Sequence, residues 1–270
     1  GAMMIAEEST AWPGVTKPPE EGGLGFTFKW NMGWMHDFLE YMKLDPYFRK
    51  YNHNRMTFSL TYFTSENYIL VLSHDEVVHL KCSMINKMPG LGEDKFSNLK
   101  AGYTFMLGHP GKKLLFMGQD FGQWHEWDEK VSLDWYLAEE ESHKKLQEYV
   151  RDLLHIYKKY PCLYQLDNDW NGFQWINAND GDRSIFSFIR KDETGKKNLL
   201  FVVNFTPVDR PDYRVGVPKR CKLSLLLDNV HGAYKPSQCP TYTSVKSECD
   251  GQPYSISYPL GGYGTAIFRF

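Results

Sequence analysis

Three stretches of this chain share one pattern, a short apolar run that ends abruptly in acidic residues. The clearest is 68–76, where five strand-forming residues are followed by Ser-His-Asp-Glu. Residues 3–10 and 113–120 repeat the pattern. Continuous apolar runs are typical of strands buried on both faces, as parallel strands are. Because parallel α/β sheets bind ligands beyond the carboxyl ends of their strands, the three acidic ends predict one shared site.

Strand and helix patterns alternate through residues 1–165. A further short strand is expected at 25–30, and apolar residues recur at helical spacing in 34–42, 95–107 and 146–157. These segments make four successive βα units. Four such units are half of an eight-stranded (β/α)8 TIM barrel, so this part of the chain is predicted to be an α/β half barrel.

From about residue 166 the hydrophobic period changes to two, which indicates strands of an antiparallel sheet. The strongest strand patterns are 184–189, 198–205, 223–227 and 265–270. Turn-rich segments separate them. We therefore expect two domains, the half barrel over 1–165 and an antiparallel β-sandwich over 166–270.

Composition excludes several classes of partner. The formal net charge is −2 with 24% charged residues, so neither nucleic acid nor an anionic membrane is expected as the main partner. No apolar run reaches the roughly 18 residues of a membrane span, and the start does not resemble a secretory signal. The five cysteines are scattered without metal-ligand spacing. We expect a cytoplasmic protein with reduced thiols and with no cofactor or metal.

Carboxyl groups at the ends of different barrel strands suit the cleavage of glycosidic bonds. One acid protonates the leaving oxygen while a carboxylate forms a covalent intermediate, with the two about 5 to 5.5 Å apart in retaining enzymes. A third acid can stabilise the oxocarbenium charge. For each acid alone, a solvated loop charge or a helix N-cap is the alternative interpretation. Aromatic residues in the same loops, from a total of 16%, favour sugar binding over that alternative.

A specific set of motifs surrounds these strand ends. They are IAEEST at 5–10, WPGVT at 12–16, FKWNMGWMHD at 28–37, SHDEVVH at 73–79, GQDF at 118–121 and EW at 126–127. Together they closely resemble the C-terminal half of bacterial 1,4-α-glucan branching enzymes of glycoside hydrolase family 13. The resemblance implies a TIM barrel followed by an all-β domain. It also implies a retaining transglycosylase that cleaves an α-1,4 link in amylose or glycogen and rejoins the chain to a 6-hydroxyl, making an α-1,6 branch.

The resemblance assigns roles to individual residues. Glu7 matches the acid/base at the end of barrel strand five, and Asp75 matches the transition-state stabiliser at the end of strand seven. His74 is expected to contact sugar hydroxyls. Glu8 would point away from Glu7 on an extended strand, which favours a supporting role. Tryptophans expected in the substrate groove, with core packing as the open alternative for each, are Trp30, Trp34, Trp124 and Trp127.

One departure from the family pattern affects activity. The nucleophilic aspartate of the family follows an arginine by two residues at the end of strand four, and no apolar strand of this sequence ends in that motif. We therefore expect the chain to begin at strand five and to be inactive alone. The alternatives are a glucan-binding fragment without turnover and an α-amylase-like hydrolase. Two unpaired barrel edges also raise a homodimer as a hypothesis.

Overall fold

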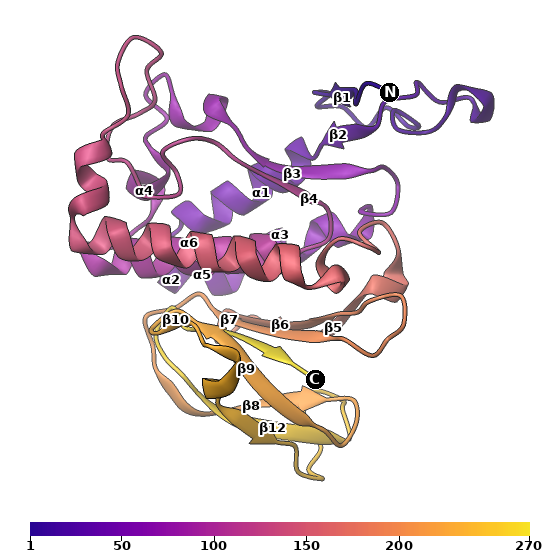
Figure 1. The fold of residues 1–270 in the computed structure, drawn as a ribbon, viewed down its shortest axis with the longest axis vertical. Coiled ribbons are helices and arrows are strands. Elements are labelled where there is room, and N and C mark those ends of the chain that lie inside the picture. Colours follow the sequence, from indigo (N-terminus) through magenta and orange to yellow (C-terminus); the bar gives the residue numbers. More distant parts are fainter.

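The computed structural model describes all 270 residues and contains one parallel sheet and two antiparallel sheets (Figure 1). The parallel sheet holds β1 (Ile5–Ala6), β2 (Phe28–Trp30), β3 (Tyr68–Leu72) and β4 (Lys112–Leu115), side by side in chain order. Every neighbouring pair is parallel, so all four carboxyl ends lie at one edge. The four strands predicted from the apolar runs are confirmed. β1 and β4 each keep one free edge.

The helices lie close to the predicted segments. The long ones are α1 (Met32–Lys43), α5 (Glu93–Gly108) and α6 (Glu141–Lys159). The short ones are α2 (Pro46–Arg49), α3 (Arg55–Phe58) and α4 (Met84–Lys87). Short 3-10 helices are η1 (Pro19–Glu21), η2 (Lys50–Asn52), η3 (Ser59–Thr61), η4 (His74–Val77), η5 (Trp135–Glu139), η6 (Pro161–Leu163), η7 (Trp170–Gly172) and η8 (Pro236–Gln238).

Local sequence explains the ends of these helices. The side chain of Asn31 accepts the N–H of Trp34 at 2.9 Å, so α1 is capped by the residue that directly follows β2. In α6, Glu141 lies in the first turn and Lys158 and Lys159 in the last, an arrangement that the helix dipole favours. α5 is buried almost all round because it lies between the parallel sheet and the antiparallel strands.

The second half of the chain forms the two antiparallel sheets. The larger has the order β10-β9-β13-β7-β6-β5, with β11 also paired to β9, and the smaller pairs β12 with β8. The bounds are β5 (Phe173–Asp180), β6 (Ile185–Arg190), β7 (Leu199–Asn204), β8 (Arg210–Val217), β9 (Lys222–Asp228), β10 (Gly232–Ala233), β11 (Thr241–Thr243), β12 (Tyr254–Leu260) and β13 (Thr265–Arg269). The four strands predicted here are confirmed as β6, β7, β9 and β13.

Two hydrophobic clusters hold these layers together. One runs from β3 through α1, α5 and α6 to Phe186, Phe188 and Phe201 on one face of the larger antiparallel sheet. The other joins the opposite face of that sheet to Val215 of β8 and Ile256 of β12. The larger sheet therefore shares one core with the helices and a second core with the smaller sheet, as the stacked layers of Figure 1 show.

A buried ionic cluster lies where α5, β4 and β6 meet. Arg190 is fully buried, and its guanidinium donates to the carbonyl of Gly108 and to the carboxylate of Asp167, both at 2.9 Å. Lys112 forms a second ion pair with Asp167 at 2.7 Å. Burial raises the pKa of Asp167, but the charges of Lys113, Arg190 and Lys112 outweigh it and lower the pKa to about 2. The carboxylate therefore stays ionised in the interior.

None of the helices combines the length and the apolar character that a membrane crossing requires. All five cysteines are free, and Cys162 is buried in the core.

Candidate active site

Polar side chains follow three of the four parallel strands at their common edge. Glu7 and Glu8 come directly after β1, Asn31 after β2, and residues 73–76 after β3. β2 separates β1 from β3, so with strands spaced about 4.8 Å apart the two acidic ends are roughly 10 Å from each other. The fold thus brings the strand ends that carry Glu7 and Asp75 to one edge.

Glu7 and Glu8 are neighbours with different surroundings. Glu7 is exposed and lines a cleft of about 500 Å³ together with Trp12. The Glu8 carboxylate forms an ion pair of 2.7 Å with the buried Lys29 and accepts the N–H of Thr10 at 2.8 Å. Hydrogen bonds from Lys29 and Thr10 lower the pKa of Glu8 to about 2. Glu8 is therefore ionised at neutral pH and held by Lys29, whereas Glu7 is exposed at the cleft and accessible to a bound molecule.

A capped turn follows β3 and separates its two acids. The carboxylate of Glu76 accepts the N–H and the hydroxyl of Ser73, both at 2.7 Å, and the hydroxyl of Ser73 accepts the N–H of Asp75. Glu76 is buried, whereas the side chains of His74 and Asp75 are each 46% exposed. The Glu76 carboxylate therefore stabilises the turn, whereas the side chains of His74 and Asp75 remain accessible to a ligand.

Three rings gather beyond the ends of β3 and β4. The imidazole of His74 lies 5.9 Å from the ring of Phe116 and 6.1 Å from that of Trp127. Phe116 and Trp127 meet edge to face at 5.1 Å. The main-chain N–H of Trp127 donates to the carbonyl of Val77 at 3.0 Å, which fastens the loop behind β4 to the turn after β3. Nε2 of His74 lies 3.2 Å from the Asp75 carboxylate, so this ring cluster places an apolar surface next to a polar anchor, as sugar binding requires.

The other tryptophans expected in the groove have different places. Trp30 is partly buried and lines a cleft of about 720 Å³ that also contains Trp12. Trp34 is 2% exposed and stacked on Phe38 at 4.8 Å. It is a core residue, which corrects the expectation that it contacts substrate. Trp124 packs edge-on against Phe96, so core packing accounts for it as well.

The acid expected after β4 is directed elsewhere. Asp120 accepts a hydrogen bond from the side-chain amide of Gln147 on α6 at 3.0 Å, and the residue that directly follows β4 is Phe116. The expectation of a third acid from this strand was therefore wrong. Sequence reasoning missed Phe116, Trp12 and Lys29; for Phe116 the available signal was an aromatic ring at the end of an apolar run.

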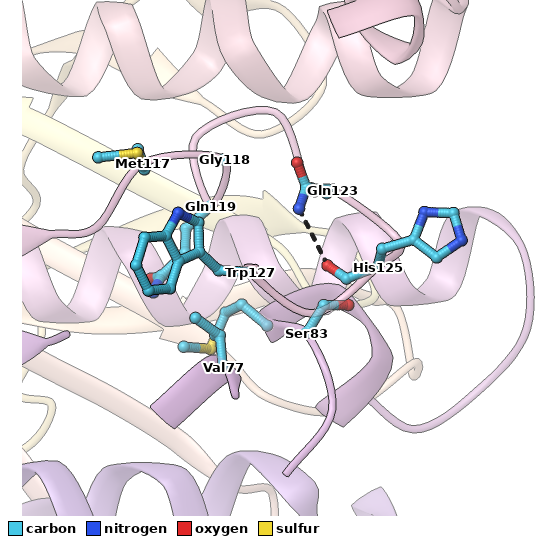
Figure 2. A pocket seen from close by; sticks show the side chains of 9 residues that line it. Val77, Ser83, Met117, Gly118, Gln119, Gln123, His125 and Trp127 are labelled. Atoms are coloured by element: carbon cyan, nitrogen blue, oxygen red, sulfur yellow. Dashed lines mark hydrogen bonds between the residues drawn. The ribbon is translucent and has the colours of Figure 1, made fainter. Parts of the chain in front are cut away.

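A small pocket lies between residues 117–127, which follow β4, and residues 77–84, and Figure 2 shows the side chains that line it. Its volume of about 10 Å³ is close to that of one water molecule, too little for a sugar ring. The amide of Gln123 donates to the carbonyl of His125 at 3.2 Å, while the imidazole of His125 is turned away and pairs with Asp134 at 2.6 Å. The pocket therefore belongs to the internal packing of this loop. Across the molecule no three His, Cys, Asp or Glu side chains are grouped as a metal site would require.

Known proteins of similar sequence were found along the whole chain. Residues 175–270 match the family model of the alpha amylase C-terminal all-beta domain. The chain is 58% identical to the 1,4-alpha-glucan branching enzyme GlgB of Butyrivibrio fibrisolvens, over 99% of this chain and 42% of the relative. The GlgB of Halothermothrix orenii is 54% identical, over 99% of this chain and 43% of the relative. The chain thus spans about two fifths of the length of these curated relatives.

Solved structures share the fold at low sequence identity. An alpha-amylase from H. orenii matches 99% of this chain and 53% of its own, with a TM-score of 0.62 and 14% identity. AmyP in complex with maltose matches 99% of this chain and 55% of its own, with a TM-score of 0.64 and 14% identity. The mixed α/β fold with antiparallel sheets is therefore an alpha-amylase-like fold.

Proposed function

Because this chain belongs to the 1,4-alpha-glucan branching enzyme family, we propose that it forms part of an enzyme that makes α-1,6 branches in glucans. That enzyme cleaves an α-1,4 link of amylose or glycogen and transfers the released chain to a 6-hydroxyl. The observation that carries the proposal is the placement of Glu7 and Asp75 at one edge of a parallel sheet. We call this chain, joined to the region of its relatives that it does not span, the full-length enzyme.

The proposed fold of the full-length enzyme is a (β/α)8 barrel followed by a β-sandwich. Residues 1–165 would contribute barrel strands five to eight, and residues 166–270 the C-terminal domain. Support comes from the parallel order β1-β2-β3-β4 with a free edge at each end. The family model that covers residues 175–270 supports the second part.

In the proposed mechanism Glu7 acts as the acid and then as the base. It gives its proton to the glycosidic oxygen as the C1–O bond breaks, and a carboxylate from the remainder of the full-length enzyme forms a covalent bond to C1. Glu7, now ionised, takes the proton of the acceptor 6-hydroxyl as the new C1–O bond forms and the nucleophile departs. Two inversions retain the α configuration. Asp75 would stabilise the positive charge that develops on the sugar in both steps.

The surroundings of these acids support the assignment. Glu8 is tied to Lys29 and stays ionised, so it cannot deliver a proton at neutral pH. Glu76 is occupied by the turn after β3. For sugar contacts we propose His74, Trp127 and Trp30, since the first two form the ring cluster beside Asp75 and the third lines the neighbouring cleft.

The 270 residues alone suit a second function, glucan binding without turnover. The residues that directly follow β2 and β4 are Asn31 and Phe116, so the four strand ends supply only two of the three carboxyl groups that the mechanism requires. For the isolated chain we also propose pairing of two copies through the free edges of β1 and β4. Size-exclusion chromatography with light scattering tests that pairing, and a monomer at all concentrations contradicts it.

Iodine staining of amylose, followed by debranching to count new branches, tests the main proposal. In the full-length enzyme, Glu7→Gln should lower branch formation by about 10² to 10⁴, the usual contribution of general acid–base catalysis. Glu8→Gln, the matched control at the adjacent position, should keep substantially more activity. The 270-residue chain should leave the stain unchanged. Full branch formation by the Glu7→Gln enzyme would refute the assignment.

A further inference from the structure

The segment that follows the turn after β3 has an unusual backbone. His79, Leu80 and Cys82 have φ values of 55°, 66° and 68°, in the left-handed region that favours glycine. The side chain of Leu80 is 96% exposed, so packing does not compensate the strain there. Such conformations persist when surrounding contacts over-determine them, often beside functional sites. Other contacts must hold residues 79–82.

The carboxylate of Glu126 supplies those contacts. One oxygen accepts the N–H of Leu80 at 2.9 Å, and the other accepts the N–H of Cys82 at 2.6 Å. A single carboxylate therefore bridges two main-chain donors across Lys81. Hydrogen bonds from N–H groups to an ionised acceptor are short and strong, so both amides are held in the left-handed geometry.

The clamped segment is connected to the candidate catalytic residues from both sides. The ammonium of Lys81 donates to the main-chain carbonyl of Asp75 at 2.8 Å. The residue after Glu126 is Trp127, whose N–H bonds to Val77 and whose ring lies beside His74. Movement of Glu126 would therefore disturb the backbone of Asp75 and the ring cluster together.

We propose that Glu126 is a positioning residue, whose carboxylate clamps residues 79–82 and thereby fixes Asp75 and His74 for the reaction. The inference rests on the proposed function and adds to it a residue that touches neither substrate nor reacting atoms. It also explains why a half-buried acid on the loop after β4 bonds to the loop after β3. Glycine at position 80 would accept the positive φ without strain, so it should reduce the need for the clamp.

Hydrogen–deuterium exchange on the 270-residue chain tests the clamp without any catalytic readout. In Glu126→Ala the amides of Leu80 and Cys82 should exchange at least about tenfold faster, because each loses its acceptor. Glu126→Gln retains one acceptor oxygen, so its exchange rates at Leu80 and Cys82 should lie between those of Glu126→Ala and the wild type. Amides of β6 and β7 report whether the chain remains folded. Unchanged exchange at Leu80 and Cys82 would overturn the proposal.

Branch formation by the full-length enzyme tests the effect on the reaction. Glu126→Ala should lower kcat about tenfold with an unchanged thermal unfolding midpoint, and adding Leu80→Gly should restore most of the loss. If Glu126 had a purely structural role, Glu126→Ala would lower the thermal unfolding midpoint, and adding Leu80→Gly would not restore kcat. Faster exchange with unchanged kcat overturns the positioning role. Absence of branch formation in the wild-type enzyme would refute the proposed function and the catalytic part of this inference. The hydrogen–deuterium exchange rates would still show whether Glu126 holds residues 79–82.

Discussion

Trp34 and Trp127 have the same chemistry but different surroundings. The ring of Trp34 projects from α1 into the core and stacks on Phe38. The ring of Trp127 is partly exposed and meets the edges of His74 and Phe116. A fully buried ring contributes through packing, whereas a partly exposed ring also offers a surface to a ligand. Substitutions at the two positions should therefore affect different properties.

Trp127→Ala in the full-length enzyme should weaken binding of maltoheptaose about 2- to 10-fold, the range of one aromatic contact. Trp34→Phe should leave that affinity unchanged and lower the free energy of unfolding by about 1 to 3 kcal/mol, since a smaller ring leaves a gap in the core. Isothermal titration and urea denaturation measure the two effects. Loss of affinity in Trp34→Phe with full stability would reverse the assignment.

The residues of the site were predictable where the chain itself fixes their place. Glu7, His74 and Asp75 directly follow apolar strands, and strand ends in a parallel sheet share one edge. The direction of a side chain in a long loop depends on partners far along the sequence. Asp120 is turned by Gln147, a residue of another element, and nothing near Asp120 indicates this.

Among the elements, α5 lies between the parallel sheet and the larger antiparallel sheet, and most of its residues are buried. A Cβ added to Gly108 would lie 2.7 Å from two ring atoms of Phe188 and 2.8 Å from Phe201, both on strands. A Cβ added to Gly102 would meet the flexible end of Met42 at 2.9 Å and one ring carbon of Phe38 at 3.2 Å. The two glycines share one helix but face neighbours of different stiffness.

Gly108→Ala should therefore destabilise the chain by about 1 to 3 kcal/mol through overpacking. Gly102→Ala is the matched control, and there the gain in helix propensity of about 1 kcal/mol offsets the displacement of Met42. Urea unfolding followed by circular dichroism measures both variants. Equal destabilisation by the two alanines would show that contact with Phe188 does not decide the effect.

Strands with a uniform pattern were predicted, and strands with mixed composition were not. β8 contains Pro211 and Gly216, and β12 contains Pro259, residues that normally indicate turns. Apart from one isolated bridge between Ser255 and Val245, these two strands pair with each other, and the register shifts between Tyr258 and Leu260, on either side of Pro259. Proline is tolerated in edge strands and at bulges. The strands β8 and β12 can therefore be recognised from their pairing in the structure but not from their sequences.

At the scale of the whole molecule, the helical layer and the larger antiparallel sheet share one hydrophobic core. The Asp167 carboxylate forms ion pairs with both Arg190 and Lys112 within that junction. Removing one partner leaves buried charge without compensation, which usually costs about 3 to 5 kcal/mol. The junction should therefore be sensitive both to substitution and to pH.

Asp167→Asn should lower the free energy of unfolding by several kcal/mol at pH 7. The folded pKa of Asp167 is about 2, below its usual 3.8, so its stabilising contribution is present above pH 4 and lost as pH falls towards 2. The difference in free energy of unfolding between the wild type and Asp167→Asn should therefore shrink as pH falls from 4 towards 2. Urea unfolding between pH 7 and pH 2 measures this difference, with the exposed Asp212 changed to Asn as control. A difference in free energy of unfolding that stays constant with pH would contradict the ionised role of Asp167 in this junction.

The role of Glu7 is tested most directly by azide rescue of a Glu7→Ala full-length enzyme with α-maltosyl fluoride as donor. Fluoride leaves without a proton, so the glycosyl-enzyme still forms, and azide then attacks it without a general base. The Glu7→Ala enzyme should show little activity on amylose, recover activity with the fluoride donor when azide is added, and form α-maltosyl azide. Asp75→Ala should show no such recovery. Absence of the azide product from Glu7→Ala, or equal rescue of Asp75→Ala, would contradict the assignment of Glu7 as the acid/base.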